Sequence, residues 1–168
     1  MVDAAVLIPV YRDSGGELHI IMILRKPGGV HGGQIGFPGG KREPGDATML
    51  ATALREAHEE IGLAPEQIEL IAELPVTETR TTGFRVFPFL ARIAVPAQWE
   101  IAEPEVAEVV DVRLCNFLRR EDSRVDSGRE EKPANMPFYD LGKHRLWGLS
   151  YRILEPLMAR LAAGEWSV

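Results

Sequence analysis

The segment 36–63 constrains this chain more than any other stretch, because it places three glutamates on one side of a predicted helix. Its last nine residues, 55–63, read REAHEEIGL. A helix turns by about 100° per residue, so Glu56, Glu59 and Glu60 fall within an arc of about 100°. A separate apolar stripe at helical spacing consists of Leu50, Ala53, Leu54, Ala57 and Ile61. We therefore expect the stripe to face a core and the three carboxylates to face solvent.

The glutamate cluster is unfavourable for a helix unless a cation lies beside it. Like charges three and four residues apart repel, and negative charge near a helix C-terminus opposes the macrodipole. Arg55 relieves part of this repulsion by pairing with Glu59 one turn later. Carboxylate oxygens are the ligands that Mg²⁺ and Mn²⁺ prefer, so the cluster is a candidate metal site. The competing interpretation is a solvated acidic face, which is the common meaning of nearby glutamates on an exposed helix.

The residues around the cluster resemble a known signature, the Nudix box. Its general pattern is G-x5-E-x7-R-E-U-x-E-E-x-G-U, where U is a bulky apolar residue. The matching residues are Arg55, Glu56, Glu59, Glu60, Gly62 and Leu63, with Ala57 as a small residue at the first U position. Counted from Gly40, the acidic residue is Asp46, and eight residues rather than seven separate it from Arg55. One extra residue, with Asp for Glu, resembles the coenzyme A diphosphatase branch of this family.

The resemblance implies a fold, a reaction and roles for the motif residues. Nudix proteins are α/β/α sandwiches with a mixed β-sheet, and they hydrolyse a diphosphate linked to another moiety with Mg²⁺ or Mn²⁺ as cofactor. By this resemblance, Glu56 and Glu60 are the leading metal ligands, and the Gly40 carbonyl is a further candidate. Glu59 shares a metal or acts as the general base, a role that can also lie outside the box. Arg55 is expected to orient Glu59 rather than to bind substrate.

Two further segments resemble the coenzyme A branch and bear on the substrate. They are HGGQIGFPGG at 31–40 and HRLWGLSYRIL at 144–154. The branch signature also carries two arginines before the glycine that corresponds to Gly33, and here Gly29 stands in the place of the second. The candidate contacts to substrate phosphates are the basic residues near the box: Arg25, Lys26, Lys41 and Arg42.

Three functional hypotheses follow from these segments. The first is a coenzyme A diphosphatase that produces 4′-phosphopantetheine and 3′,5′-ADP. The second is another hydrolase of the same family, acting on ADP-ribose or a dinucleotide. The third is a Nudix-fold ligand sensor without catalysis. The intact Arg-Glu-x-x-Glu-Glu sequence favours an enzyme, because a sensor can lose carboxylates without penalty.

Length, composition and charge limit the number of domains, the class of partner and the location expected for this chain. The chain has 168 residues, of which 45% are hydrophobic, so we expect one domain over 1–168. The irregular order of its expected strands and helices indicates the α+β class. A net charge of −6 argues against nucleic acid as a partner, and no apolar stretch approaches the ~20 residues of a membrane span. No basic region precedes the first apolar run, so we expect a cytoplasmic protein. The partner that the resemblance implies is a small-molecule diphosphate. The sequence leaves the oligomeric state open, with a homodimer as one option.

Local patterns predict the order of secondary structure. Strands are expected at 4–12, 17–25, 34–37, 67–74, 84–95 and 106–112, with a hairpin at 136–146. Helices are expected at 47–61, 114–120 and 147–162, with Asp46 as the N-cap of the first. Pro88 favours a sheet edge or a bulge, and Pro156 favours a kink or break in the last helix. The charged segment 121–135 has no apolar periodicity and is expected to be a surface loop.

Overall fold

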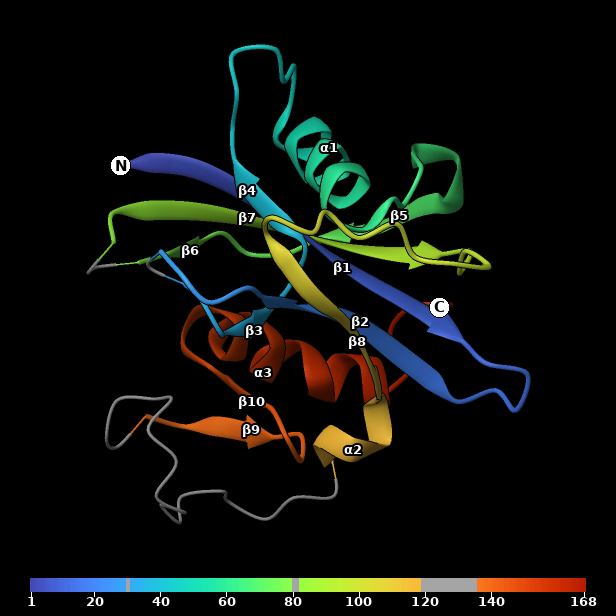
Figure 1. Ribbon diagram of the computed structural model, residues 1–168. Helices are drawn as coiled ribbons and strands as arrows, with labels where there is room; N and C mark the ends of the chain where they lie inside the picture. The colour runs from blue at the N-terminus through green and yellow to red at the C-terminus, as the bar shows by residue number, and fades with distance from the viewer. Residues whose placement is uncertain (30, 80–81, 119–135) are drawn as a thin grey trace.

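A mixed β-sheet lies between two long helices in the computed structural model of this chain, which describes residues 1–29, 31–79, 82–118 and 136–168 (Figure 1). Helix α1 (Met49–Ile61) covers one face of the sheet, and α3 (Gly148–Ala162) covers the other. The predicted α+β class, with a helix on each side of a mixed sheet, is confirmed. No helix in the described ranges is long and apolar enough to cross a lipid bilayer. The predicted loop 121–135 lies outside the described residues.

The sheet is built around its central strand, β1. The strands are β1 (Val2–Arg12), β2 (Leu18–Arg25), β3 (Ile35–Gly36), β4 (Gly39–Lys41), β5 (Ile68–Glu73), β6 (Thr77–Glu78), β7 (Phe84–Ile93) and β8 (Val106–Arg113). Their main order is β3-β2-β1-β7-β5, while β4 pairs with β1, β6 with β7 and β8 with β2. Only the β1–β7 pair among these described strands is parallel. The pairing of β4 with β1 brings the chain entering α1 to the start of the central strand.

The smaller elements follow the sheet. Helix α2 (Leu114–Leu118) comes after β8, and the remainder of the predicted helix 114–120 lies outside the described residues. Strands β9 (Phe138–Asp140) and β10 (Arg145–Trp147) form the predicted hairpin. The last helix begins at Gly148 and continues through Pro156 without a break. A single 3₁₀ turn, Pro65–Gln67, links α1 to β5.

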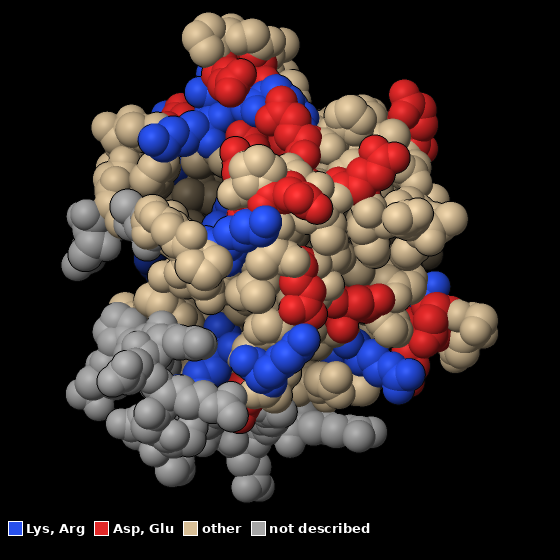
Figure 2. All heavy atoms as spheres, in the orientation of Figure 1, with Lys and Arg blue, Asp and Glu red and all other residues tan. Residues whose placement is uncertain are grey.

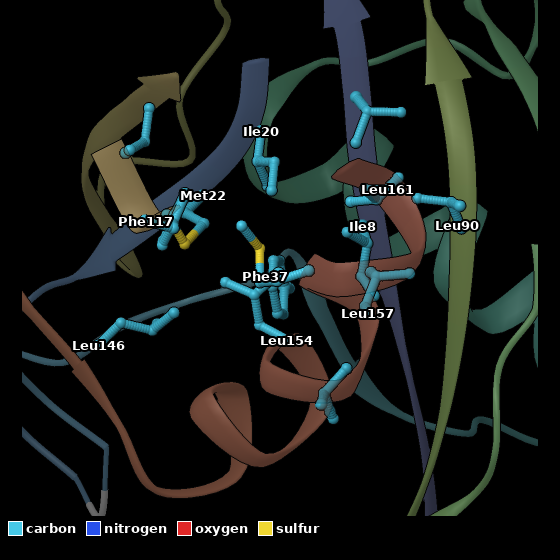
Figure 3. Packing of buried hydrophobic residues seen from close by; sticks show 14 of the residues in the cluster. Ile8, Ile20, Met22, Phe37, Leu90, Phe117, Leu146, Leu154, Leu157 and Leu161 are labelled. Carbon is cyan, nitrogen blue, oxygen red and sulfur yellow. The ribbon is translucent and has the colours of Figure 1, made fainter. Parts of the chain in front are cut away.

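Strand β2 contributes to a core on each face of the sheet, because successive side chains of a strand point in opposite directions. Ile20 and Met22 belong to the cluster that packs against α3 (Figure 3). Ile21 and Ile23 belong to the cluster that packs against α1. From α1, that cluster receives Ala53, Ala57 and Ile61. Burial on both faces explains the nearly continuous apolar sequence of β2.

The start of α1 differs from the sequence prediction, and the assignment of Asp46 as its N-cap is wrong. The helix begins at Met49, and its N-cap is Thr48, whose Oγ1 accepts a hydrogen bond from the Ala51 amide at 3.0 Å. A threonine oxygen in this position satisfies one of the free amides of the first turn. Because Thr48 caps the helix, the Asp46 carboxylate can bind a different partner.

Pro88 does not lie at a sheet edge, because β7 runs between β1 and β5. The strand beside β7 changes at this point: β6 pairs with β7 up to Val86, and β5 pairs with it from Phe89. Proline cannot donate a backbone hydrogen bond. Pro88 therefore lies between the part of β7 that pairs with β6 and the part that pairs with β5, where the lack of a backbone N–H destabilises the sheet least.

A polar cluster lies at the end of β2 opposite Arg25. His19 is 9% exposed, with Nδ1 at 2.6 Å from Asp111 Oδ1 and Nε2 at 3.1 Å from Asp13 Oδ2. The Tyr11 ring stacks on the imidazole, and its hydroxyl donates to Asp111. Burial lowers the pKa of His19, but the hydrogen bonds to Asp111 and Asp13 outweigh it and leave that pKa raised. His19 thus joins the β1–β2 turn to β8 through Asp13 and Asp111.

We predict that His19 stabilises the fold at mildly acidic pH and less at alkaline pH. Its contribution is complete below the unfolded pKa of about 6.5 and is lost as pH rises through the raised folded pKa. Urea unfolding of wild type and His19→Gln across this range should show a difference in free energy that shrinks with rising pH. His31→Gln, at an exposed histidine, is the control. A difference that stays constant with pH would contradict the prediction.

Candidate active site

Two glycines at the start of β4 allow two close approaches. A side-chain carbon on Gly39 would overlap with the β1 backbone at Ala5 and Val6. A side-chain carbon on Gly40 would instead overlap with the carboxylate of Glu56 on α1. Gly39 therefore allows β4 to lie close against β1. Gly40 leaves the space in which the Glu56 carboxylate lies against β4.

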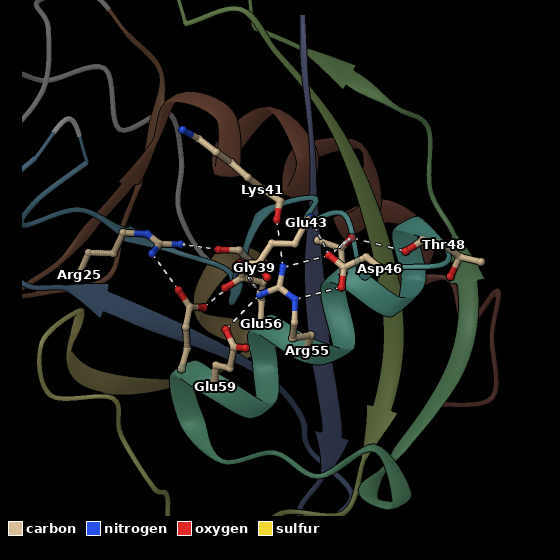
Figure 4. A network of polar contacts seen from close by, with 11 residues as sticks. Arg25, Gly39, Lys41, Glu43, Asp46, Thr48, Arg55, Glu56 and Glu59 are labelled. Carbon is tan, nitrogen blue, oxygen red and sulfur yellow. Dashed lines mark hydrogen bonds and ion pairs between the residues drawn. The ribbon is translucent and has the colours of Figure 1, made fainter.

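Arg55 lies at the centre of a polar network on α1 (Figure 4). Its Nε and Nη2 donate to the two oxygens of Asp46, each at 3.0 Å, and Nη2 also donates to the Lys41 carbonyl at 3.0 Å. Its Nη1 donates to Glu56 Oε1 at 3.1 Å and to Glu59 Oε2 at 3.0 Å. One guanidinium thus joins the loop before α1 to two of the three glutamates.

Asp46 is the fixed counter-charge of Arg55. It is 7% exposed and also accepts hydrogen bonds from the Thr52 hydroxyl and the Glu43 amide, both at 2.9 Å. The hydrogen bonds from Arg55 and from the Glu43 amide hold the pKa of Asp46 well below its ordinary value. The acidic residue expected from the sequence to cap the helix therefore anchors the arginine of the motif.

Glu60 points inward, so the prediction that all three glutamates face solvent is wrong for this residue. Its side chain is 2% exposed, and Arg25 Nη1 donates to its Oε1 at 2.9 Å. The Gly39 amide donates to its Oε2 at 2.9 Å, and Arg25 Nη2 donates to the Gly39 carbonyl at 3.2 Å. Burial raises the pKa of Glu60 to about 7, although Arg25 and the Gly39 amide act in the opposite direction.

The other two glutamates differ in their exposure. The Glu56 side chain is 14% exposed and that of Glu59 is 56% exposed. Burial raises the pKa of Glu56, and Arg55 opposes this shift. Figure 2 shows Asp and Glu side chains lying beside Lys and Arg over the region of α1 and the loop before it. The site is therefore a surface of mixed charge, with one carboxylate in solvent, one at the boundary and one inside.

The four basic residues predicted to contact phosphates fall into two groups. Arg25 is paired with Glu60, and Arg42 donates to the Asp46 carbonyl at 3.1 Å. Lys26 and Lys41 are exposed, and Lys41 Nζ lies 5.5 Å from the centre of the Phe84 ring. Arg42 is exposed as well, so Arg25 is the one residue of these four that is half-buried.

The donor chemistry of this site suits a hard divalent ion. Glu56 and Glu59 supply carboxylate oxygens on consecutive turns of α1. Because Gly40 has no side chain, the Glu56 carboxylate can lie against the backbone of β4. Within the described ranges, no three His, Cys, Asp or Glu side chains are already grouped as a metal site. Mg²⁺ commonly keeps several waters and takes one or two carboxylates together with substrate phosphates, so this donor set fits it.

The pairing of Arg25 with Glu60 was not predicted from the sequence. The two residues are 35 positions apart, and only the packing of α1 against the sheet brings them together. The available signal was charge imbalance, because three glutamates on α1 stand against the single Arg55. A second cation from elsewhere in the chain was therefore to be expected near the cluster.

Comparisons with known proteins show which chains this one is similar to. The NUDIX domain family matches residues 1–132. A Citrobacter koseri protein named Uncharacterized Nudix hydrolase NudL is 41% identical over 120 residues, which span 70% of this chain and 60% of that protein. The protein of the same name from Klebsiella pneumoniae subsp. pneumoniae is 39% identical over 165 residues, or 96% of this chain and 83% of that protein. The match thus covers less than two thirds of the length of the Citrobacter relative.

A solved structure shows the same fold over nearly the whole chain. The crystal structure of RenU, a Nudix hydrolase from M. smegmatis, superposes with a TM-score of 0.68 at 16% identity. The superposition covers 99% of this chain and 89% of that one. Similarity at this level of identity shows the fold alone, and it confirms the sandwich with a mixed sheet that the resemblance implied.

Replacing each of the two glycines with alanine should affect a different property: the stability of the fold at Gly39 and metal binding at Gly40. We predict that Gly39→Ala costs about 1–3 kcal/mol or more in free energy of unfolding, because the added carbon meets the rigid backbone of β1. Gly40→Ala should stay within about 1 kcal/mol of wild type, since the flexible Glu56 side chain can turn away. Gly40→Ala should nevertheless weaken Mn²⁺ binding, measured by calorimetry. Equal stability losses, or unchanged Mn²⁺ binding by Gly40→Ala, would contradict these expectations.

Proposed function

The chain belongs to the Nudix family, and from that premise we propose that it is a Mg²⁺- or Mn²⁺-dependent hydrolase that splits coenzyme A into 4′-phosphopantetheine and 3′,5′-ADP. The observation that carries the metal-dependent hydrolysis is the position of Glu56, whereas the choice of coenzyme A rests on the resemblance of segments 31–40 and 144–154 to that branch. The Glu56 carboxylate lies against Gly40 and is held by Arg55, with Glu59 on the next turn. This is a concentration of oxygen ligands at the edge of solvent, where an ion and a diphosphate can both reach it.

A phosphoanhydride resists hydrolysis because its negative oxygens repel an incoming nucleophile. A bound divalent ion supplies charge neutralisation, orients the phosphates and lowers the pKa of a water that it holds. Glu56, Glu60 and the Gly40 carbonyl are the groups that would hold the ion in this chain. Glu60 is engaged by Arg25 and the Gly39 amide, so its use as a ligand requires those bonds to change.

Glu59 and the basic residues take the remaining roles. Glu59 is exposed and can accept the proton of the attacking water or share the ion. Arg55, which donates a hydrogen bond to Glu59 Oε2, is its positioning residue. Lys26 and Lys41 are exposed and contact the substrate phosphates, with Arg25 and Arg42 available once they leave their present partners.

One observation favours a second substrate class, ADP-ribose or a dinucleotide. Gly29 takes the place of a loop arginine in the coenzyme A signature, and a side-chain carbon added there would meet no atom of the described residues within 4 Å. At this position the chain thus lacks the guanidinium with which that signature meets phosphate. The retained Glu56, Glu59 and Glu60 argue against a sensor without catalysis.

Hydrolysis should require Mg²⁺ or Mn²⁺, should stop in EDTA, and should fall by at least about 100-fold in Glu56→Gln. The variant keeps the shape of the side chain but removes a charged ligand, so it should remain folded. Activity and melting temperature are measured together. Glu66→Gln, in the 3₁₀ turn after α1, is the control. Full turnover in chelator, or near-normal turnover by Glu56→Gln, would overturn the proposed mechanism.

The substrate assignment is tested by comparing kcat/KM for coenzyme A, dephospho-coenzyme A and ADP-ribose at one metal concentration. We expect the first two to differ by less than about tenfold, because one exposed charged contact is worth about 1 kcal/mol and Gly29 supplies none. ADP-ribose should be poorer if the pantetheine arm is recognised. A clear preference for ADP-ribose would replace the coenzyme A assignment and leave the phosphoanhydride chemistry in place.

A further inference from the structure

Arg25 closes a ring of three hydrogen bonds at the base of the site. It is the last residue of β2, and its two terminal nitrogens donate to Glu60 Oε1 and to the Gly39 carbonyl. The Gly39 amide completes the ring by donating to Glu60 Oε2. Both oxygens of the buried carboxylate are therefore engaged, one by a cation and one by the backbone.

The ring gives Glu60 a counter-charge that belongs to the protein. The carboxylate is 2% exposed, whereas the Arg25 side chain is 29% exposed, so the cation lies on the solvent side of the pair. A planar guanidinium with several donors is well suited to bridge a carboxylate and a carbonyl in this way. Any divalent ion that takes Glu60 as a ligand must replace the Arg25 bond at Oε1 or compete with its charge.

A similar relation exists at the neighbouring glutamates, but it is weaker there. Arg55 bonds Glu56 and Glu59, yet it is also anchored by both oxygens of Asp46 and by the Lys41 carbonyl. Arg55 thus has a fixed partner of its own. Arg25 is different, because among the described residues its guanidinium donates to Glu60 and to the Gly39 carbonyl, both members of the ring.

We propose that Arg25 is an internal competitor of the divalent ion at Glu60, and that it sets how much metal the protein needs. This inference rests on the proposed function, because it takes Glu60 to be a ligand of that ion. Without metal, Arg25 neutralises Glu60 and holds the Gly39–Gly40 strand against α1. A bound ion would neutralise Glu60 in its place, and the partly exposed Arg25 guanidinium would then be available to the substrate phosphates.

The test compares wild type with Arg25→Met, which keeps much of the length of the side chain and removes its charge. Melting temperatures are recorded in EDTA and in saturating Mn²⁺, and the Kd for Mn²⁺ is measured by calorimetry without substrate. Arg25→Met should melt well below wild type in EDTA, and that difference should shrink in Mn²⁺ because the ion supplies the missing charge. By linkage, its Mn²⁺ Kd should be tighter by about fivefold or more.

Two further variants complete the design. Arg92→Met removes an arginine of β7 that pairs with Glu69 on the neighbouring strand, and its loss of stability should be the same with and without Mn²⁺. Arg25→Lys keeps a positive charge and should fold even if Arg25→Met does not. A single ammonium cannot reproduce the bridging fork, so its Mn²⁺ affinity should also exceed that of wild type.

The possible outcomes distinguish a failure of the proposed Arg25 competition from a failure of the proposed metal-dependent function. If wild type binds Mn²⁺ and the Arg25 variants bind it equally or more weakly, Arg25 supports the site or the fold and does not compete with the ion. A stability loss of Arg25→Met that is equal in EDTA and in Mn²⁺ would likewise overturn the proposed competition. If wild type itself neither binds Mn²⁺ nor is stabilised by it, the proposed metal-dependent function fails together with this inference.

Discussion

The buried carboxylate of Glu60 is the constraint on which the arrangement of this site depends. A charge that is almost wholly removed from water is costly unless it is paired and hydrogen-bonded on its remaining oxygen. Arg25 from β2 and the Gly39 amide from β4 meet both needs. Helix α1 is thereby tied to two strands at once, and the glycine strand is fixed beneath the face that carries Glu56 and Glu59.

A second anchor acts at the other end of the motif. Asp46 is buried and fixes Arg55, and Arg55 in turn orients the two more exposed glutamates. The site thus contains two arginine–carboxylate pairs with different roles, and Arg25 of the first pair comes from β2 rather than from the motif. One pair holds the helix to the sheet, and the other aims the carboxylates that are proposed to meet the metal and the substrate.

Much of the fold could be predicted from the sequence, because its signals are local. The continuous apolar run of β2, the stripe on α1 and the glycine that ends this helix all depend on neighbours within a few residues. The N-cap at Thr48 was missed because Asp46 is an equally good capping residue by type. Its pairing with Arg55, nine positions later, decides the competition, and that pairing depends on how the loop folds back.

The inward turn of Glu60 could not be predicted in the same way. The helical arc of the three glutamates is correct as geometry, but a helix face can lie partly against another element. Only the packing of α1 on the sheet determines that Glu59 meets solvent while Glu60 meets Arg25, 35 positions away. The resemblance to a family motif identified the residues and left their environment undetermined.

The central claim is that the Glu56–Gly40 contact is where a divalent ion binds. The most direct measurement is anomalous diffraction at the manganese edge from crystals of the protein soaked in Mn²⁺. We predict an anomalous peak at ligand distance from a Glu56 carboxylate oxygen and beside the Gly40 backbone. A peak found only elsewhere on the protein, or no peak at saturating Mn²⁺, would contradict that claim.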